Sequence, residues 1–127
     1  MSDRPTVVVT GLGGGGLGEQ ILKALRLSTL QYRVVGCDVT RISKGLQEVD
    51  APYLVPPAVD PDYVTCVLAV CRKEAARALF PGSEPELRAL SRERGRLHQA
   101  GVFCPMNPES VIDLCLDQAI AGVIFHR

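Results

Sequence analysis

The chain has 127 residues, of which 46% are hydrophobic and 22% are charged. This length suits a single domain over residues 1–127 whose core is large enough to fold without disulfides or a structural metal. Its fourteen basic and fourteen acidic residues cancel. Because nucleic acids and anionic membranes attract clusters of Lys and Arg, which this sequence lacks, we expect neither as a partner.

Cysteine usage and the first residues indicate a location. The five cysteines form no Cys-x-x-Cys pair, and there are only two histidines, so we expect reduced core thiols and no zinc site. The start, Met1 to Pro5, lacks the apolar core of a signal peptide. No apolar run reaches the roughly 20 residues that cross a bilayer. We therefore expect a cytoplasmic protein.

The first half of the chain alternates strands with a helix. The β-branched run Val7–Val9 is typical of a strand buried on both faces, as in a parallel sheet. The following apolar residues recur at helical spacing. The predicted elements are a strand over residues 6–10, a helix over about 17–30, a strand over 32–38, a loop that could hold one helical turn over 39–50, and a strand over 53–55.

The second half continues the alternation. Asp60 followed by Pro61 predicts a helix start, with Asp60 as the capping residue. Ser83 with Glu86 three residues later forms a capping box for another helix. The apolar stripe of the helix after Asp60 consists of Tyr63, Val64, Val67, Leu68 and Cys71. The remaining predicted elements are strands over 78–80 and 102–104 and a helix that begins at 107–108.

This alternation predicts an α/β fold, since strands joined by helical crossovers form a parallel sheet with helices on both faces. We expect a Rossmann-like, three-layer α/β/α domain with five parallel strands in the order 3-2-1-4-5. The strand order then reverses between the first and fourth strands. The loops after these two strands, the glycine-rich turn and residues 81–86, should open onto one crevice.

The turn after the first strand is the most unusual segment of the sequence. It satisfies Gly-x-Gly-x-x-Gly in two registers, and a helix N-terminus behind such a turn suits a phosphate or carboxylate. Asp38 lies where a ribose-binding acid lies in a dinucleotide fold. Three interpretations stay open: a tight turn without a ligand, a generic anion site, and an NAD site. The candidate binding glycines are Gly11, Gly13, Gly14, Gly15 and Gly16.

The loop across the crevice adds Ser83, Glu84 and Glu86 as candidate substrate- or anion-binding residues. Glu86 is also the expected partner of the Ser83 cap, which leaves Glu84 freer to bind an amine or a cation. A P-loop is excluded, because Gly18 is followed by Glu19 where a P-loop has its lysine. We assign no catalytic residue and no metal ligand, since no nucleophile–base pair can be assembled from the strand-end loops.

Five segments together resemble the N-terminal, pre-ATP-grasp domain of ATP-grasp proteins, with the carbamoyl-phosphate synthase large-chain-like group as the nearest resemblance. They occur in the family's order and cover nearly the whole chain: Val9 to Gly15, Ile21 to Arg26, Val34 to Asp38, Tyr53 to Tyr63, and Pro81 to Leu87. The resemblance implies a ligase that uses ATP and magnesium to join a carboxylate to an amine. It also implies that later domains hold ATP and the metal.

The chain alone is therefore expected to bind no cofactor and to supply one side of the acceptor-substrate crevice. Its expected partners are ATP-grasp domains or another protein chain. Two other classes remain open. One is an NAD(P)-binding domain of the short-chain reductase/epimerase type, although no Tyr-x-x-x-Lys pair is present. The other is an interaction module that forms a homo-oligomer through the apolar segment from Ala119 to Phe125, because large exposed apolar patches are rare on monomers.

Overall fold

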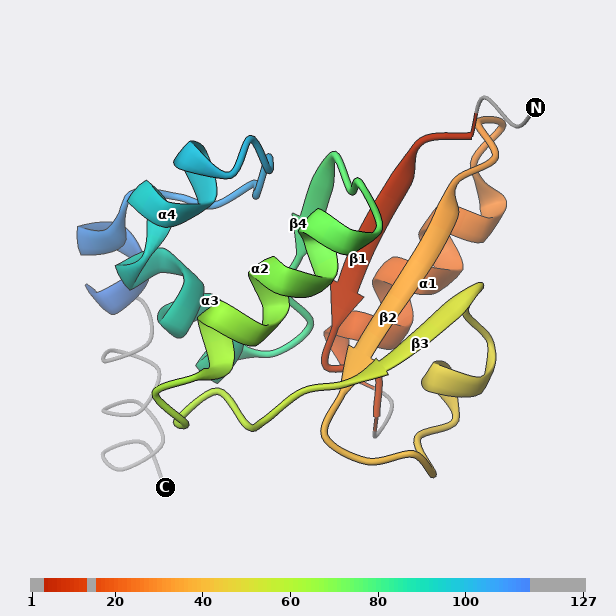
Figure 1. Ribbon diagram of the computed structural model, residues 1–127, viewed down its shortest axis with the longest axis horizontal. Coiled ribbons are helices and arrows are strands. Elements are labelled where there is room, and N and C mark those ends of the chain that lie inside the picture. The colour runs from red at the N-terminus through yellow and green to blue at the C-terminus, as the bar shows by residue number, and fades with distance from the viewer. Residues whose placement is uncertain (1–3, 14–15, 115–127) are drawn as a thin grey trace, which may run out of the picture.

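A parallel sheet forms the centre of the computed structural model, which describes residues 4–13 and 16–114 (Figure 1). Its strands are β1 (Thr6–Thr10), β2 (Arg33–Asp38), β3 (Ala51–Leu54) and β4 (Ala78–Phe80). They lie in the order β3-β2-β1-β4, and every pair is parallel. The predicted α/β class and the predicted reversal of strand order between β1 and β4 are confirmed.

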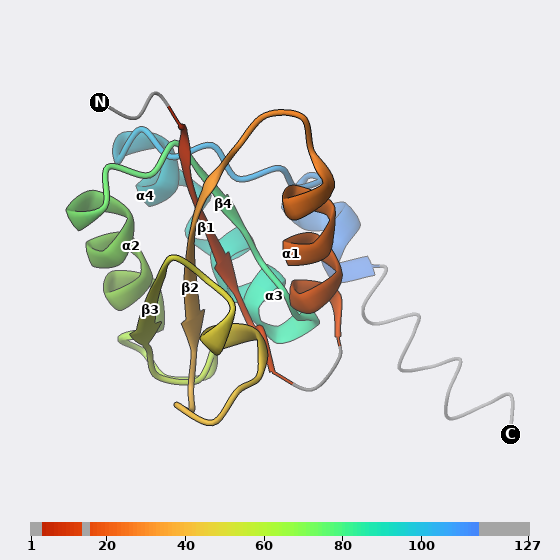
Figure 2. The ribbon, with the colours of Figure 1, turned by 90° about the vertical axis from the view of Figure 1, so that its right-hand side faces the viewer.

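Helices cover both faces of the sheet (Figure 2). The helix α1 (Leu17–Leu27) and the short 3₁₀ helix η1 (Gly45–Gln47) pack on one face. The other face is covered by α2 (Tyr63–Lys73), α3 (Glu84–Arg92) and α4 (Arg94–Gln99). The chain is thus an α/β/α sandwich, as the alternation of strands and helices predicts.

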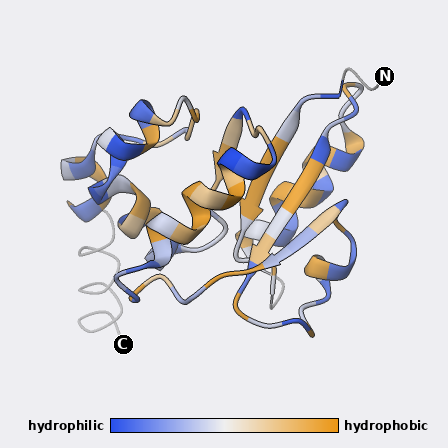
Figure 3. Ribbon diagram, in the orientation of Figure 1, coloured by the Kyte–Doolittle hydropathy of each residue, from blue (hydrophilic) through white to orange (hydrophobic). Residues whose placement is uncertain are grey.

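The β-branched run of β1 explains how the two cores form. Val7 and Val9 pack with Leu22 of α1, whereas Val8 packs with Val67 of α2. Successive side chains of a strand point to opposite faces, so a strand between two helical layers needs apolar residues at every position. Figure 3 shows this as hydrophobic colour along the central strands and on the helix surfaces beside them.

Two helices differ from their predicted bounds. α1 ends at Leu27 rather than at residue 30, because Ser28 adopts an extended conformation and its hydroxyl accepts the N–H of Leu30. α2 begins at Tyr63, two residues later than a cap at Asp60 implies. The Asp60 carboxylate instead accepts the N–H of Asp62 at 2.8 Å. That contact forms a turn leading into the helix.

The predicted fifth strand is wrong in extent, although its position beside β4 is right. Only Phe103 pairs, in a parallel bridge with Ala78. The N–H of Val102 is taken by the carbonyl of Leu97 at 3.1 Å, which closes the end of α4. Pro105 follows shortly after and has no N–H to donate. One residue is therefore left for the ladder, and the sheet has four strands.

The described cysteines are free thiols, and Cys37 and Cys71 lie in the core. Burial, aided by the charge of Cys104, raises the pKa of Cys71 to about 12, so it behaves as a small apolar residue.

Residues 109–114 are helical, while the segment from Ala119 to Phe125 lies outside the described residues. Within the described part of the chain, no helix has the length and apolar character needed to cross a membrane.

Candidate functional site: a cleft at the carboxyl edge of the sheet

A cleft of about 460 Å³ opens where the strand order reverses. The segments that follow all four strands contribute to its walls. It brings together six of the residues predicted from sequence: Gly11, Gly13, Gly16, Asp38, Ser83 and Glu86. The cleft thus lies at the carboxyl ends of the strands beside the reversal, where ligands bind in open α/β sheets.

One predicted site residue lies elsewhere, and two others are outside the described residues. Glu84 lines a separate hollow beside Leu17 and Phe80, toward α1. It does not line the cleft, so the structure does not bring Glu84 together with Glu86. Gly14 and Gly15 lie outside the described residues, and their place in the site stays a prediction.

Part of the glycine signal is explained by two loops that touch through their backbones. A Cβ atom on Gly82 would lie 1.9 Å from the carbonyl oxygen of Thr10. A Cβ atom on Gly18 would lie 2.4 Å from the carbonyl oxygen of Gly11. The Gly18 N–H donates to the Gly82 carbonyl at 3.2 Å, and the Gly82 N–H donates to the Thr10 hydroxyl at 3.2 Å. Gly18 and Gly82 are therefore required by packing between the loops.

Glu86 is held by hydroxyl groups on both of its carboxylate oxygens. Ser83 caps α3 by accepting the Glu86 N–H, and its hydroxyl donates back to Oε1 of Glu86 at 2.8 Å. The hydroxyl of Tyr63 donates to Oε2 at 2.5 Å. The predicted pairing of Ser83 with Glu86 is confirmed, with the serine hydroxyl as a donor to the glutamate side chain.

Tyr63 is a site residue that sequence reasoning missed, because its position fits the apolar stripe of α2. Its side chain is almost fully buried. Burial raises the pKa of the Tyr63 hydroxyl, and the charge of Glu86 and its hydrogen bond raise it further. A buried tyrosine hydroxyl normally finds a polar partner, which is the only sequence signal that could have suggested this contact.

The Glu86 carboxylate also touches the glycine turn. A Cβ atom on Gly11, whose φ is +62°, would lie 2.2 Å from Oε1 of Glu86. The carboxylate therefore occupies the space above the first glycine of the turn. In a dinucleotide fold, the glycines allow the pyrophosphate to approach the backbone here. A phosphate at this point would meet a buried negative charge.

Asp38 ends β2 and is 7% exposed. Its Oδ1 accepts the N–H of Val39 at 2.7 Å. Its Oδ2 is buried and has no hydrogen-bond partner among the described residues. A Cβ atom on Gly13 would lie 2.9 Å from this oxygen, so Gly13 allows the turn to pass directly beside it. Asp38 is thus a buried carboxylate whose Oδ2 lies against the glycine turn and is closed off from solvent.

The charged lining of the cleft is entirely acidic. Asp38 and Glu86 are its ionisable residues, and no Lys or Arg is among the described residues that line it. Both charges also reach the thiol of Cys37, whose pKa is raised first by burial, then by Cys71, and further by these two carboxylates. Because like charges repel, this lining disfavours an anion such as a phosphate.

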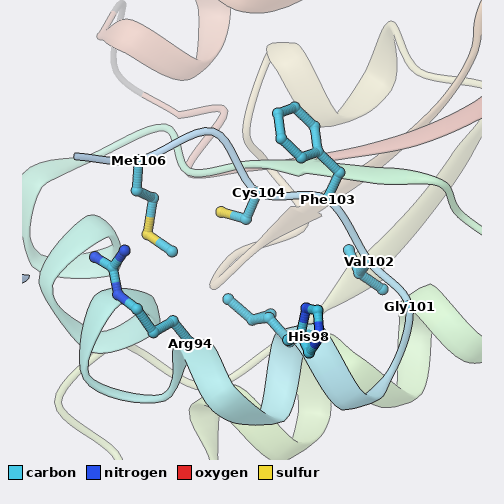
Figure 4. A pocket seen from close by; sticks show the side chains of 8 residues that line it. Arg94, His98, Gly101, Val102, Phe103, Cys104 and Met106 are labelled. Atoms are coloured by element: carbon cyan, nitrogen blue, oxygen red, sulfur yellow. The ribbon is translucent and has the colours of Figure 1, made fainter. Parts of the chain in front are cut away.

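A second hollow, of about 420 Å³, lies between α4 and residues 101–106 (Figure 4). Cys104 and Met106 point toward it, whereas Phe103 points away. Its cation is already engaged, because Arg94 donates to the Ser91 hydroxyl at 2.8 Å and to the Asn107 carbonyl at 2.7 Å. Burial raises the pKa of the Cys104 thiol to about 11, which keeps it protonated at neutral pH. These contacts attach residues 101–107 to the helices.

The parallel sheet, its two helical layers and the reversal of strand order define a Rossmann-like α/β/α domain. Within this class, the chain belongs to the PylC-like N-terminal domain family, which matches residues 11–106. This is an N-terminal domain of the pre-ATP-grasp type, so that part of the resemblance is confirmed. No curated protein matches the chain by sequence.

Solved structures share this fold. The chain is similar to the biotin carboxylase domain of a thermophilic 2-oxoglutarate carboxylase, with a TM-score of 0.65, 16% identity and 86% of this chain covered. It is also similar to pyruvate carboxylase from Rhizobium etli (TM-score 0.66, 13% identity, 88% covered). A third similar structure is that of glycinamide-RNase-transformylase T from Mycobacterium tuberculosis, with a TM-score of 0.57, 18% identity and 78% of this chain covered.

The match spans only part of each of these proteins. It covers 28% of the transformylase chain, 24% of the biotin carboxylase chain and 12% of the pyruvate carboxylase chain. A dTDP-glucose 4,6-dehydratase from Bacillus anthracis, in complex with NAD, matches with a TM-score of 0.54 and 13% identity over 79% of this chain. At these identities the similarities show the fold alone.

Proposed function

We propose that this chain is the substrate-side domain of an ATP-grasp ligase that joins a carboxylate to an amine, and that it does not catalyse the reaction alone. In this proposal ATP-grasp domains, on the same or another polypeptide in the cytoplasm, hold ATP and magnesium and activate the carboxylate. The family match supports the ATP-grasp context. The carbamoyl-phosphate synthase-like relationship is part of the proposal and rests on the sequence segments quoted above.

The position of Glu86 is the observation that carries the proposal. Its carboxylate lies against Gly11, where a nucleotide phosphate would need to approach the glycine turn. The hydroxyl of Ser83 also lines the cleft, but it caps α3 and donates to Glu86. The described lining therefore offers acceptors and shape for a substrate. It offers no cation for a phosphate and no activated nucleophile.

An NAD(P)-binding domain of the reductase/epimerase type is the second candidate. The position of Asp38 at the end of β2 favours it, because a ribose-binding acid lies there in a dinucleotide fold. The acidic space at Gly11 argues against it, since the pyrophosphate would lie beside Glu86. An interaction module that self-associates through residues 119–125 also remains a proposal, and that segment lies outside the described residues.

Phosphate release from ATP tests the ligase proposal. The purified 127-residue chain is incubated with ATP, magnesium, and mixtures of simple carboxylates and amines, and inorganic phosphate is measured. We expect no turnover by the chain alone. We expect phosphate release that requires both a carboxylate and an amine once ATP-grasp domains that complete the enzyme are present. ATP turnover by the chain alone would contradict the proposal.

A further inference from the structure

We propose that the apolar segment of residues 115–125 docks onto its own domain, against the part of the sheet that α1 leaves uncovered. The inference does not rest on the proposed function, since it concerns how this chain covers its own sheet. It competes with self-association through the same segment, and the two differ in which copy of the chain the segment contacts.

The sheet face that carries α1 is uncovered over β4. Leu79 in the middle of β4 points to the α2 face and is fully buried. Its neighbours Ala78 and Phe80 point to the opposite face, toward α1, and are only half-buried. Phe103 bridges to Ala78, so its side chain lies on the same face, and it is 66% exposed. Helices cover both faces of a parallel sheet, so a covering element is missing here among the described residues.

An apolar hollow of about 280 Å³ lies at this uncovered part, between the first turn of α1 and the start of α3. Phe80 forms part of its wall, and Leu17 at its rim is 56% exposed. Exposed apolar side chains that gather in one place are rare unless another element or molecule covers them. The apolar lining consists of Leu17, Ile21, Phe80, Pro81, Leu87 and Pro105.

The last described residues lie beside this hollow. Residues 109–114 are helical and lie on the α1 side of the sheet (Figure 2). The ion pair between Arg88 and Asp113, at 3.6 Å, joins them to α3. Arg88 follows Glu84 by four residues, so the two lie on one face of α3, and Glu84 lines the hollow. The segment that begins at residue 115 therefore starts close to the hollow.

The sequence of the segment fits this position. Ile112 is 4% exposed and marks the buried side of residues 109–114. Helical spacing continued from Ile112 places further apolar residues within one stripe about 100° wide, whereas Asp117 and Gln118 fall outside it. A helix over 115–125 would be about 16 Å long. The residues of the stripe are Ile112, Leu116, Ala119, Ile120 and Val123.

The covalent link favours the segment's own domain over a second copy. A segment joined directly to residue 114 meets the hollow at an effective concentration of about a millimolar. In a dilute sample the other copies are far less concentrated. Docking within one chain therefore wins as long as the segment reaches the hollow without strain.

Methyl NMR of the full chain tests the proposal. We expect nuclear Overhauser contacts from the methyl groups of residues 116–123 to the ring protons of Phe80 or Phe103. A sample that mixes isotope-labelled with unlabelled copies shows whether these contacts lie within one chain or between two. Contacts that occur only between copies, or no contact from these methyl groups to either ring, would overturn the proposal.

A pair of variants in α1 then locates the docking surface. Leu17→Gln makes the rim of the hollow polar, and we expect it to speed hydrogen exchange of the amides of residues 116–125 about tenfold, because it weakens the apolar contact that protects them. Leu27→Gln is the matched control. Leu27 is 86% exposed in the same helix and does not line the hollow, so exchange should match that of the unaltered chain. Equal exchange rates in all three proteins, with amide spectra showing an intact fold, would overturn the proposal.

Discussion

Replacing Gly82 by alanine should break the contact between the two loops that form the cleft. The added Cβ would lie 1.9 Å from the Thr10 carbonyl oxygen and 2.7 Å from the Cα of Gly18. Both obstacles are backbone atoms, which cannot move aside by rotation. Cβ contacts below 3.0 Å essentially never occur. The loops must therefore separate by about 1.1 Å or more at the Thr10 carbonyl oxygen, which is the difference between 3.0 Å and 1.9 Å.

That separation removes the two hydrogen bonds of Gly82, to Gly18 and to Thr10. Each is worth about 1 kcal/mol, and forcing extra volume into a packed site costs about 1–3 kcal/mol more. We therefore expect Gly82→Ala to lower the free energy of unfolding by about 3 kcal/mol or more. For a domain of this size that corresponds to a fall of about 12 °C in Tm.

Urea unfolding followed by circular dichroism measures this change. Gly95→Ala is the matched control, because Gly95 lies in α4 and an added Cβ would meet nothing within 4 Å. Alanine is the better helix former, so the control should gain about 0.5–1 kcal/mol. Gly18→Ala disrupts the same contact, and the double variant with Gly82→Ala should cost less than the sum of the two. A Gly82→Ala protein within 0.5 kcal/mol of the unaltered chain would refute the reasoning.

Two further predictions concern buried and partly buried carboxylates. Tyr63→Phe removes the hydroxyl that donates to Glu86, and urea unfolding should show a loss of about 1–3 kcal/mol because a buried acceptor is left without its donor; a change near zero would mean that the contact contributes nothing. The hydroxyl of Tyr53 and then the guanidinium of Arg33 hold the pKa of Glu74 below its usual value. This stabilisation is complete above the unfolded pKa of about 4.3 and is lost as pH falls through the lower folded value. Glu74→Gln should therefore be less stable than the unaltered chain at pH 7, and the difference in Tm should shrink toward pH 2; a difference that does not depend on pH would contradict the assignment.

The sequence predicted the sheet well because the signal for buried parallel strands is local. A run such as Val7–Val9 is apolar at every position, and the alternation with helices fixes a parallel order. The fifth strand failed for a tertiary reason. The Val102 N–H closes α4 rather than joining the ladder, and this choice depends on where α4 ends in space.

The candidate site was predicted in part. Asp38 lies at the carboxyl end of β2, and Glu86 lies in the helix that follows β4. Both line one cleft, because the carboxyl ends of parallel strands lie at the same edge of the sheet. Glu84 does not, since residues two apart on a helix lie about 200° around its axis and cannot face the same way. That argument was available from the sequence once the Ser83 cap fixed the start of α3.

Contacts between distant segments could not be predicted. The need for glycine at position 82 arises only when Thr10, which is 72 residues away, comes against it. The same holds for the hydroxyl of Tyr63, whose partner Glu86 lies 23 residues further along the chain. Such contacts depend on side-chain and backbone positions that no periodicity or local motif encodes.

The measurement that tests the central claim most directly is an amide NMR titration of the chain with NADH. If the acidic space at Gly11 keeps the cleft from being a dinucleotide site, NADH leaves the signals of Gly13 and Val39 unchanged up to millimolar concentration. Saturable shifts of the same amides at micromolar NADH would contradict the account.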